Sequence, residues 1–403
     1  TYLIIKSNKG GKFLKKILIT LSFIFICCGC YNYKELNDLA ITSAIGIDKS
    51  DDGYKVTAQV VNTQKEGTDN NSSSDPKIII YEHTSKTVQE AVRYMVLESP
   101  KRLYPNHMQV IIISEDVAKD GILESLDLFF RDSELQKNFY VLIAKDVSAN
   151  QILKTLTPAD SIVSSNIKKS LESDSSYLGI TELVTYDELI NTYLNPNKEI
   201  SLPSVTLKGK MKGSDKIDNI EQSDSSTKVV LSQMAIFKDD KMIGYLDDKQ
   251  SIALSFIKGK INNTIIKYKC NGGYVVVETT NSKSSINVDN KGNFRIKISG
   301  DAAINEVSCD INLENDNSIS KINKQVNKEI KKNVNNTIKY VKNNYNSDIF
   351  NFLDILYKNQ YSLYKKISND WYKDKFKDSK IDIDVDIKVI EKGNTLKVIK
   401  NEK

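Results

Sequence analysis

The sequence predicts a mixed α/β and α+β protein of three domains, each with a β-sheet flanked by helices. Strand-like apolar runs alternate with helical patterns over residues 30–159, which favours an α/β layer. Apolar residues recur every three or four positions over 319–345, as in one long amphipathic helix. Residues 381–389 alternate strictly between apolar and charged side chains, which favours a largely antiparallel sheet beside that helix in the last domain.

Residues 1–29 have the pattern of a lipoprotein signal peptide. Five lysines and no acidic residue precede an apolar run over 17–26. As a helix this run spans ~15 Å, about half of the hydrocarbon core of a membrane. Gly29 precedes Cys30 as in a lipobox, where cleavage leaves a cysteine whose thiol carries diacylglycerol. Cys27 stands where a lipobox usually has leucine.

Two alternatives to the lipobox are an uncleaved anchor and a metal site. The C-C-x-C spacing lacks the ligand pattern of a zinc site and has no nearby histidine. Because the chain begins at Thr1 rather than at Met, we expect the true basic region to differ from the one given.

The charge balance argues against a nucleic-acid binder. The 57 basic residues include the five lysines of the leader, so the chain from Cys30 onward carries 52 basic and 52 acidic residues. A nucleic-acid-binding surface needs a basic footprint, which this balance does not provide. Beyond Cys30 only Cys270 and Cys309 remain. They form either a disulfide outside the cytoplasm or two buried thiols, and the sequence leaves both open.

The N-terminal domain is expected over residues 30–159. It opens with an apolar-rich stretch over 35–48. Ser85 and Ser114 can each cap a helix. The expected strands are 54–62, 78–81, 108–113 and 139–144, and further helices are expected over 122–130 and 148–156.

A small middle domain with a linker is expected over residues 160–228. It holds helical stretches near 161–171 and 185–194, and residues 209–228 have the composition of a linker or long surface loop. The C-terminal domain, 229–403, opens with a hairpin over 229–246. A helix over 248–257, several strands to about 313, the long helix and strands at 381–389 and 395–399 follow. The stripe of the long helix fits packing on its own sheet, with a partner helix as the alternative.

Catalytic and metal-binding motifs are absent from the sequence. The chain has two histidines, His83 and His107, and neither lies in a zinc-protease, hydrolase or phosphate-loop motif. Asp382, Asp384 and Asp386 share one strand face, where side chains ~6.5–7 Å apart do not converge on one ion. We therefore expect no enzyme, no metal and no cofactor other than the lipid on Cys30.

Short motifs that follow one another along the chain resemble the C-subunit lipoproteins of spore germinant receptors, the GerAC-like family. The first motifs are Cys30-Tyr31-Asn32, Glu35-Leu36-Asn37, Leu39-Ala40 and Gly46-Ile47-Asp48. The next are LYPNHMQVIIISE at 103–115, Gly121-Ile122, Leu126-Asp127 and Arg131-Asp132. The last are the hairpin AIFKDDKMIGYL at 235–246, Asp348-Ile349-Phe350, Trp371, Phe376 and the strand at 381–389 followed by Gly393.

Two positions depart from the family pattern. Tyr31 replaces the usual tryptophan, and Asn351-Phe352-Leu353 stands where the family often has glycine-rich sequence. The conformation of the turn after Phe350 therefore stays open.

The resemblance implies a subunit held by lipid on the outer face of the spore inner membrane. It implies work with two membrane-spanning partners, the A and B subunits, in triggering germination, and three mixed α/β domains without catalytic activity. Direct binding of the germinant is not assigned. Glu35, Asn37, Asp48 and Arg131 are candidates for partner contacts, with caps, turns and a surface ion pair as the alternatives. A lipid-anchored solute-binding protein with two similar lobes is the rival function.

Overall fold

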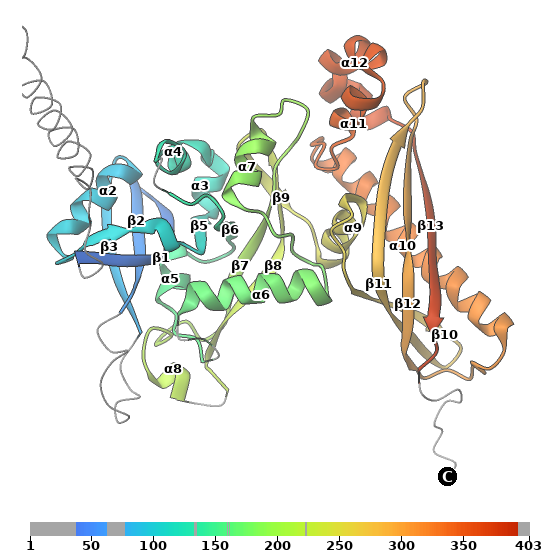
Figure 1. The fold of residues 1–403 in the computed structure, drawn as a ribbon, viewed down its shortest axis with the longest axis horizontal. Coiled ribbons are helices and arrows are strands. Elements are labelled where there is room, and N and C mark those ends of the chain that lie inside the picture. The colour runs from blue at the N-terminus through green and yellow to red at the C-terminus, as the bar shows by residue number, and fades with distance from the viewer. Residues whose placement is uncertain are drawn as a thin grey trace, which may run out of the picture.

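The computed structural model of the protein has two β-sheets that lie side by side along its longest axis (Figure 1). It describes residues 38–62, 77–132, 135–158, 160, 162–221 and 224–393. Both sheets are flanked by helices, which confirms the mixed α/β and α+β class. Gly29, Cys30, Glu35, Asn37 and the strand expected at 395–399 lie outside the described residues.

The first sheet has nine strands in the order β3-β2-β1-β5-β6-β7-β8-β9, with β4 paired to β1. Parallel pairing joins β1, β5, β6 and β7, and antiparallel pairs extend the sheet at both sides. The strands are β1 (Leu39–Ser50), β2 (Gly53–Val61), β3 (Ile78–Ser85), β4 (Arg102–Tyr104), β5 (Val110–Ser114), β6 (Tyr140–Ala144), β7 (Ser201–Gly209), β8 (Thr227–Lys238) and β9 (Lys241–Tyr245).

Helices cover both faces of this sheet, so its central strands are apolar on both sides. In β5, Ile111 and Ile113 face one core, and Val110 and Ile112 face the other. The first core also contains α2 (Val88–Tyr94), α3 (Glu115–Asp120), α4 (Leu123–Arg131) and α7 (Tyr186–Tyr193). The second contains α5 (Ala149–Lys154) and α6 (Val163–Tyr177). Short turns of 3₁₀-helix, η3 (Met95–Leu97) and η4 (Pro105–His107), flank β4.

The second sheet has four strands in the order β10-β11-β12-β13. Its pairs are antiparallel except for the parallel pair of β12 with β13. The strands are β10 (Thr264–Cys270), β11 (Gly273–Val288), β12 (Phe294–Val307) and β13 (Ile381–Glu391). In β13, Ile383 and Ile387 are buried while Asp382, Asp384 and Asp386 are exposed, as the alternation predicts.

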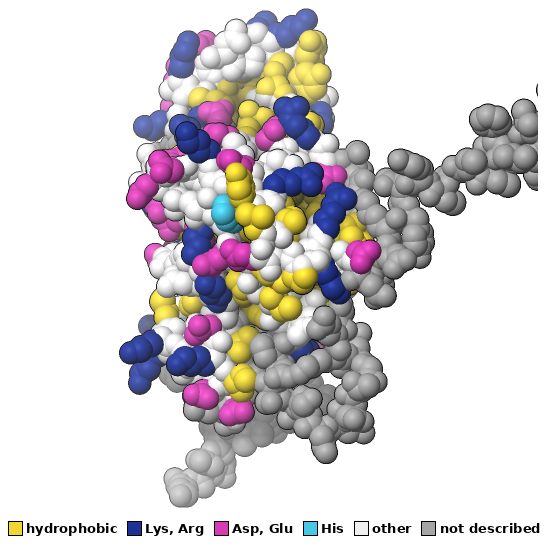
Figure 2. All heavy atoms as spheres, turned by 90° about the vertical axis from the view of Figure 1, so that its left-hand side faces the viewer, with side chains coloured by type: hydrophobic (Ala, Val, Ile, Leu, Met, Phe, Trp, Pro, Cys, Tyr) yellow, Lys and Arg dark blue, Asp and Glu magenta, His cyan; other side chains and the backbone are white. Residues whose placement is uncertain are grey.

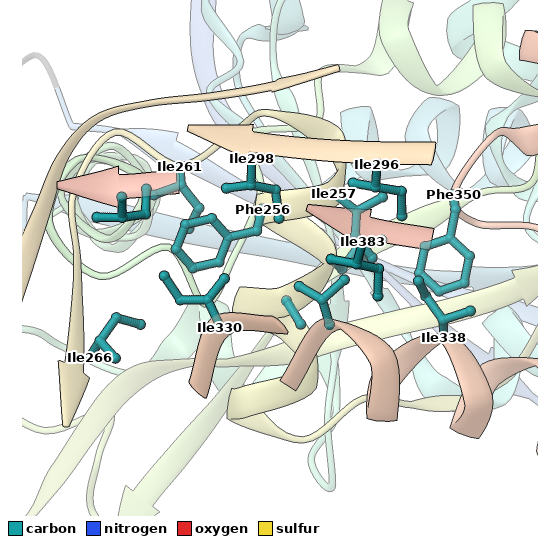
Figure 3. Packing of buried hydrophobic residues seen from close by; sticks show 14 of the residues in the cluster. Phe256, Ile257, Ile261, Ile266, Ile296, Ile298, Ile330, Ile338, Phe350 and Ile383 are labelled. Atoms are coloured by element: carbon teal, nitrogen blue, oxygen red, sulfur yellow. The ribbon is translucent and has the colours of Figure 1, made fainter. Parts of the chain in front are cut away.

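The long helix α10 (Asp316–Asn344) packs its apolar stripe on this second sheet. Figure 3 shows Ile330 and Ile338 of α10 facing the sheet residues around Ile296. The helix α9 (Asp248–Lys258) adds Phe256 and Ile257 to the same core. The prediction that the stripe covers the chain's own sheet is therefore confirmed. The short helical elements that follow are α11 (Phe352–Asn359), α12 (Tyr361–Ile367), the 3₁₀-helix η5 (Ser368–Asp370), the π-helix η6 (Trp371–Lys375) and α13 (Phe376–Asp378).

The prediction of three domains with a sheet in each is wrong in one respect, because the described residues form two sheets. The strand β7 and the hairpin β8–β9 complete the first sheet, so that sheet runs across the boundaries expected at 159 and 228. Pro203 makes β7 look like a connection, but it lies at a register shift between β7 and β8, a position where a strand tolerates proline. Residues 210–226 connect these two paired strands and contain the short helix α8 (Asp218–Glu221).

Candidate functional site

Asp48, a predicted contact residue, is a buried helix cap. Its two carboxylate oxygens accept hydrogen bonds from the backbone N–H groups of Ala149 and Asn150, at 2.8 and 2.9 Å. Burial raises the pKa of Asp48, and these two hydrogen bonds act in the opposite direction. A Cβ on Gly46 would lie 3.1 Å from the Cβ of Ala149. The Gly46-Ile47-Asp48 motif therefore fastens α5 to the central strand β1, and Asp48 has a structural role.

Arg131, the other described candidate, lies on the opposite face of the first sheet. Its side chain is 76% exposed, and its guanidinium pairs with Asp127 at 2.7 Å, one helical turn earlier in α4. It borders a groove of about 1080 Å³ between α2 and α4. Because Asp48 lies under α5, the structure does not bring the two candidates together. Arg131 remains accessible to a partner, and an exposed pair of this kind contributes little to stability.

Other motifs that resemble the receptor family meet at the β8–β9 hairpin. On the side of the first sheet, the hairpin turn meets the connection between α3 and α4. The backbone N–H of Ile122 donates to the carbonyl of Asp240 at 3.0 Å, and a Cβ on Gly121 would lie 2.7 Å from the carboxylate of Asp240. The hydroxyl of Tyr245 donates to Glu115 at 3.4 Å. Gly121 therefore allows a close approach that a side chain would block.

The other side of the hairpin meets the segment that follows α10. The Tyr345 hydroxyl donates to the carbonyl of Tyr245 at 3.2 Å, and the Ser347 hydroxyl donates to the carbonyl of Phe237 at 2.6 Å. The Lys238 ammonium donates to the carbonyl of Asn346 at 3.2 Å. These contacts join the two sheets through the hairpin. We call the hairpin and the residues that touch it the hairpin junction: residues 235–246 with Glu115, Gly121, Ile122, Glu199, Tyr345, Asn346, Ser347, Asp348 and Tyr372.

A buried charged cluster lies within the hairpin junction. Glu199, whose side chain is 3% exposed, accepts from the backbone N–H of Asp239 at 2.8 Å and pairs with Lys238 at 3.4 Å. The Lys238 ammonium lies 3.0 Å from the ring centroid of Tyr372, a close cation–π contact. Burial raises the pKa of Glu199 and lowers the pKa of Lys238. A paired charge that is withdrawn from water destabilises the protein when its partner is removed, so these contacts fix the geometry of the junction.

Asp348 lies at the end of the junction and is fully buried. Its oxygens accept from the backbone N–H groups of Phe352 and Leu353, at 3.1 and 2.8 Å, and from the indole N–H of Trp371 at 3.2 Å. Burial raises the pKa of Asp348 to about 7, against the effect of these three donors. Asn351 takes the left-handed conformation, with φ of 64°, immediately before α11. Asparagine tolerates this conformation better than most residues, so the turn forms without glycine.

A cleft of about 550 Å³ adjoins the junction and is crossed by contacts between the two halves of the molecule. The Lys258 ammonium of α9 donates to the Ser201 hydroxyl of β7 at 2.7 Å. The Asn195 amide donates to Asp354 of α11 at 3.0 Å. These contacts hold the halves together, and Lys258 also pairs with Glu182 at 3.2 Å. Among the described residues there is no group of three or more His, Cys, Asp or Glu that could hold a metal ion.

The sequence identified the hairpin and the Asp348, Trp371 and Phe376 elements but not the cluster around them. Glu199 and Tyr372 belong to no motif, Lys238 lies within the hairpin motif, and the three residues come from distant parts of the chain. The sequence offered only an indirect sign of this cluster, which is that the hairpin and the Asp348 element both belong to the family pattern.

We expect Gly244→Ala to lower the free energy of unfolding by about 1–3 kcal/mol, as overpacking does. The ring of Tyr345 lies against this glycine, and a Cβ there would come within 2.6 Å of the ring atom Cε1. Urea unfolding of Gly244→Ala, Tyr345→Ala and the double variant checks this. The double variant should cost less than the sum of the two single changes by about 1 kcal/mol. Strictly additive costs would show that the ring does not constrain position 244.

Residues 32–207 match the family described as "Spore germination protein N-terminal domain". Residues 232–393 match the family described as "Spore germination B3/ GerAC like, C-terminal". The chain therefore belongs to the GerAC family of spore germination proteins, and the resemblance inferred from its sequence is confirmed. The gap between the matched regions, residues 208–231, takes in the end of β7, the connection and the start of β8.

Known members of this family resemble the chain over most of its length. Spore germination protein KC of Bacillus subtilis (strain 168) is 26% identical over 387 residues, which cover 92% of this chain and 94% of that protein. Spore germination protein B3 of the same organism is 24% identical over 317 residues, covering 77% of this chain and 78% of the relative. The crystal structure of the GerBC protein is 18% identical, covers 86% of this chain and 96% of its own, and shares the fold with a TM-score of 0.52.

Proposed function

We propose that this chain is the lipid-anchored C subunit of a nutrient germinant receptor and acts through protein contacts rather than catalysis. The observation that carries this is that several of the family motifs meet at the hairpin junction and join the two sheets there. Three separate segments meet there through hydrogen bonds and one ion pair, between Lys238 and Glu199. Among the described residues no group of three or more His, Cys, Asp or Glu could hold a metal ion. The relatives' names supply the process, spore germination.

In this proposal Cys30 carries the lipid and the chain sits on the outer face of the spore inner membrane. A single acyl chain anchors only marginally, whereas a diacylglyceryl group supplies the two chains that stable anchoring needs. No helix in the described part of the chain is long and apolar enough to cross a membrane. The A and B subunits would supply the membrane-spanning part of the receptor.

The hairpin junction would make the two halves respond as one body. Contacts from both sheets meet on β8 and β9, so a displacement imposed on one half by a partner subunit reaches the other half through packed side chains. Coupling of this kind needs a contact with a partner and a rigid junction, and it does not need a catalysed reaction.

The test compares release of dipicolinic acid from spores of the parent, a deletion strain, Cys30→Ala and Cys28→Ala, with other nutrient receptors removed. We expect deletion and Cys30→Ala to abolish the response to nutrient and to leave a trigger that bypasses receptors unaffected. Cys28→Ala is the matched control, because that cysteine precedes the cleavage site and should respond as the parent does. Equal nutrient responses in the parent and the deletion strain would overturn the germination function.

The rival function, a lipid-anchored solute-binding protein, requires two similar lobes around a ligand cleft. The halves here differ, with nine strands in one sheet and four in the other, and contacts cross the cleft between them. This difference between the halves favours the receptor subunit over the solute-binding protein. A nutrient that raises the unfolding temperature of the purified chain would favour the rival.

A further inference from the structure

The first described strand enters the fold beside β4. Leu39 at the start of β1 pairs with Arg102 of β4. Nine peptide units separate Cys30 from Leu39, and a chain of that length spans at most about 30 Å. If Cys30 carries lipid, as in the proposed function on which this inference rests, this end of the first sheet lies close to the bilayer.

Apolar side chains are exposed at the same end, in the turn between α2 and β4. Leu97 is 80% exposed, Val96 49% and Tyr94 47%. Single exposed apolar residues are common on protein surfaces, but three within four positions form a local patch. Leu97 is the most exposed large apolar side chain of the described residues. The fold therefore leaves an apolar turn uncovered beside the point where the chain enters.

Basic side chains flank this turn. The segment 93–102 reads RYMVLESPKR, with Arg93, Lys101 and Arg102 against one acidic residue, Glu98. Arg93 and Arg102 are exposed. Figure 2, which faces this end of the molecule, shows hydrophobic side chains exposed among basic and acidic side chains. Apolar residues bracketed by basic ones match the boundary between anionic headgroups and acyl chains, where tyrosine is also favoured.

We propose that residues 93–102 form a membrane-docking turn that rests on an anionic lipid surface. Val96 and Leu97 enter the boundary between headgroups and acyl chains, and Arg93, Lys101 and Arg102 lie against lipid phosphates. The lipid on Cys30 holds the chain near the membrane but leaves its orientation free. Docking of the turn fixes which face of the first sheet looks away from the membrane, and so which surfaces the partner subunits can reach.

The experiment places an environment-sensitive fluorophore on Leu97→Cys in the full-length lipidated chain, reconstituted into vesicles that contain phosphatidylglycerol and a quencher on their acyl chains. The matched control is Leu194→Cys, a leucine that is 64% exposed at the end of α7. We expect at least about twofold quenching at position 97 and no quenching at position 194, because an inserted side chain sits at the acyl boundary. Arg93→Glu combined with Arg102→Glu should remove most of the quenching.

Flotation of the same vesicles separates the two proposals. Protein that floats with the vesicles while position 97 is no more quenched than position 194 overturns the docking turn and leaves the anchor intact. Protein that does not float overturns the lipid anchor itself. Equal quenching at position 97 in vesicles of neutral phosphatidylcholine would overturn the role given to the basic residues.

Discussion

Replacing Asp348 with alanine is expected to lower the free energy of unfolding by about 3–5 kcal/mol, the largest effect of any single change in the junction. The change leaves three buried donors without an acceptor: the N–H groups of Phe352 and Leu353 and the indole of Trp371. Trp371 is the sole tryptophan of the chain, so its fluorescence during urea unfolding reports on the affected region.

The control for Asp348→Ala is Asp224→Ala. The side chain of Asp224 is 88% exposed and forms one ion pair, with Lys228. That change should alter stability by less than about 0.5 kcal/mol. If the two variants unfold at the same urea concentration, Asp348 does not organise the turn into α11.

The pH dependence of stability gives an independent signature of Asp348. Its pKa is raised from 3.8 to about 7 in the folded chain, so the folded state binds more protons than the unfolded state between these values. Stability from this group is therefore present below pH 4 and is lost as the pH rises through about 7, by about 1.4 kcal/mol per pH unit. The difference in unfolding free energy between the parent and Asp348→Asn should shrink or reverse over that window. A difference that does not change with pH would contradict the raised pKa.

The sequence predicted those elements whose burial is periodic. The helix over 319–345 and the strand at 381–389 form as expected because each buries one face against a single neighbour. The central strand β1 was seen only as an apolar-rich stretch, since its buried Thr42 and Ser43 interrupt the pattern. Ser43 is satisfied by Gln59 of β2, at 3.1 Å, a partner that a single strand's sequence cannot reveal.

Less of the candidate site could be predicted, because its contacts join residues that are far apart in the sequence. Motif residues were visible as a family pattern, but the pattern does not say which of them touch. Asp48 reaches a helix about a hundred residues later in the chain, and Lys238 meets Tyr372 across a still longer separation. Burial of a charge depends on the tertiary contacts of both partners, so the raised pKa of Asp348 has no local sequence signal.

Loss of the disulfide between Cys270 and Cys309 is expected to lower the free energy of unfolding by about 2–4 kcal/mol. The bond joins the end of β10 to the segment between β12 and α10, with Cα atoms 6.1 Å apart and a sequence separation of 39. Closing a loop of this length removes conformational freedom from the unfolded chain, so its loss favours unfolding. The same bond holds the entry to α10, whose far end builds the hairpin junction.

The measurement compares urea unfolding of the parent and of the Cys270→Ser/Cys309→Ser variant, each with and without a thiol reductant. Reductant should lower the midpoint of the parent to that of the variant and leave the variant unchanged. A shift in the variant would point instead to the cysteines near the start of the chain, Cys27, Cys28 and Cys30. If reductant leaves the midpoint of the parent unchanged and above that of the variant, the reductant does not reach the bond. A parent that matches the variant under both conditions shows that the bond does not stabilise the fold.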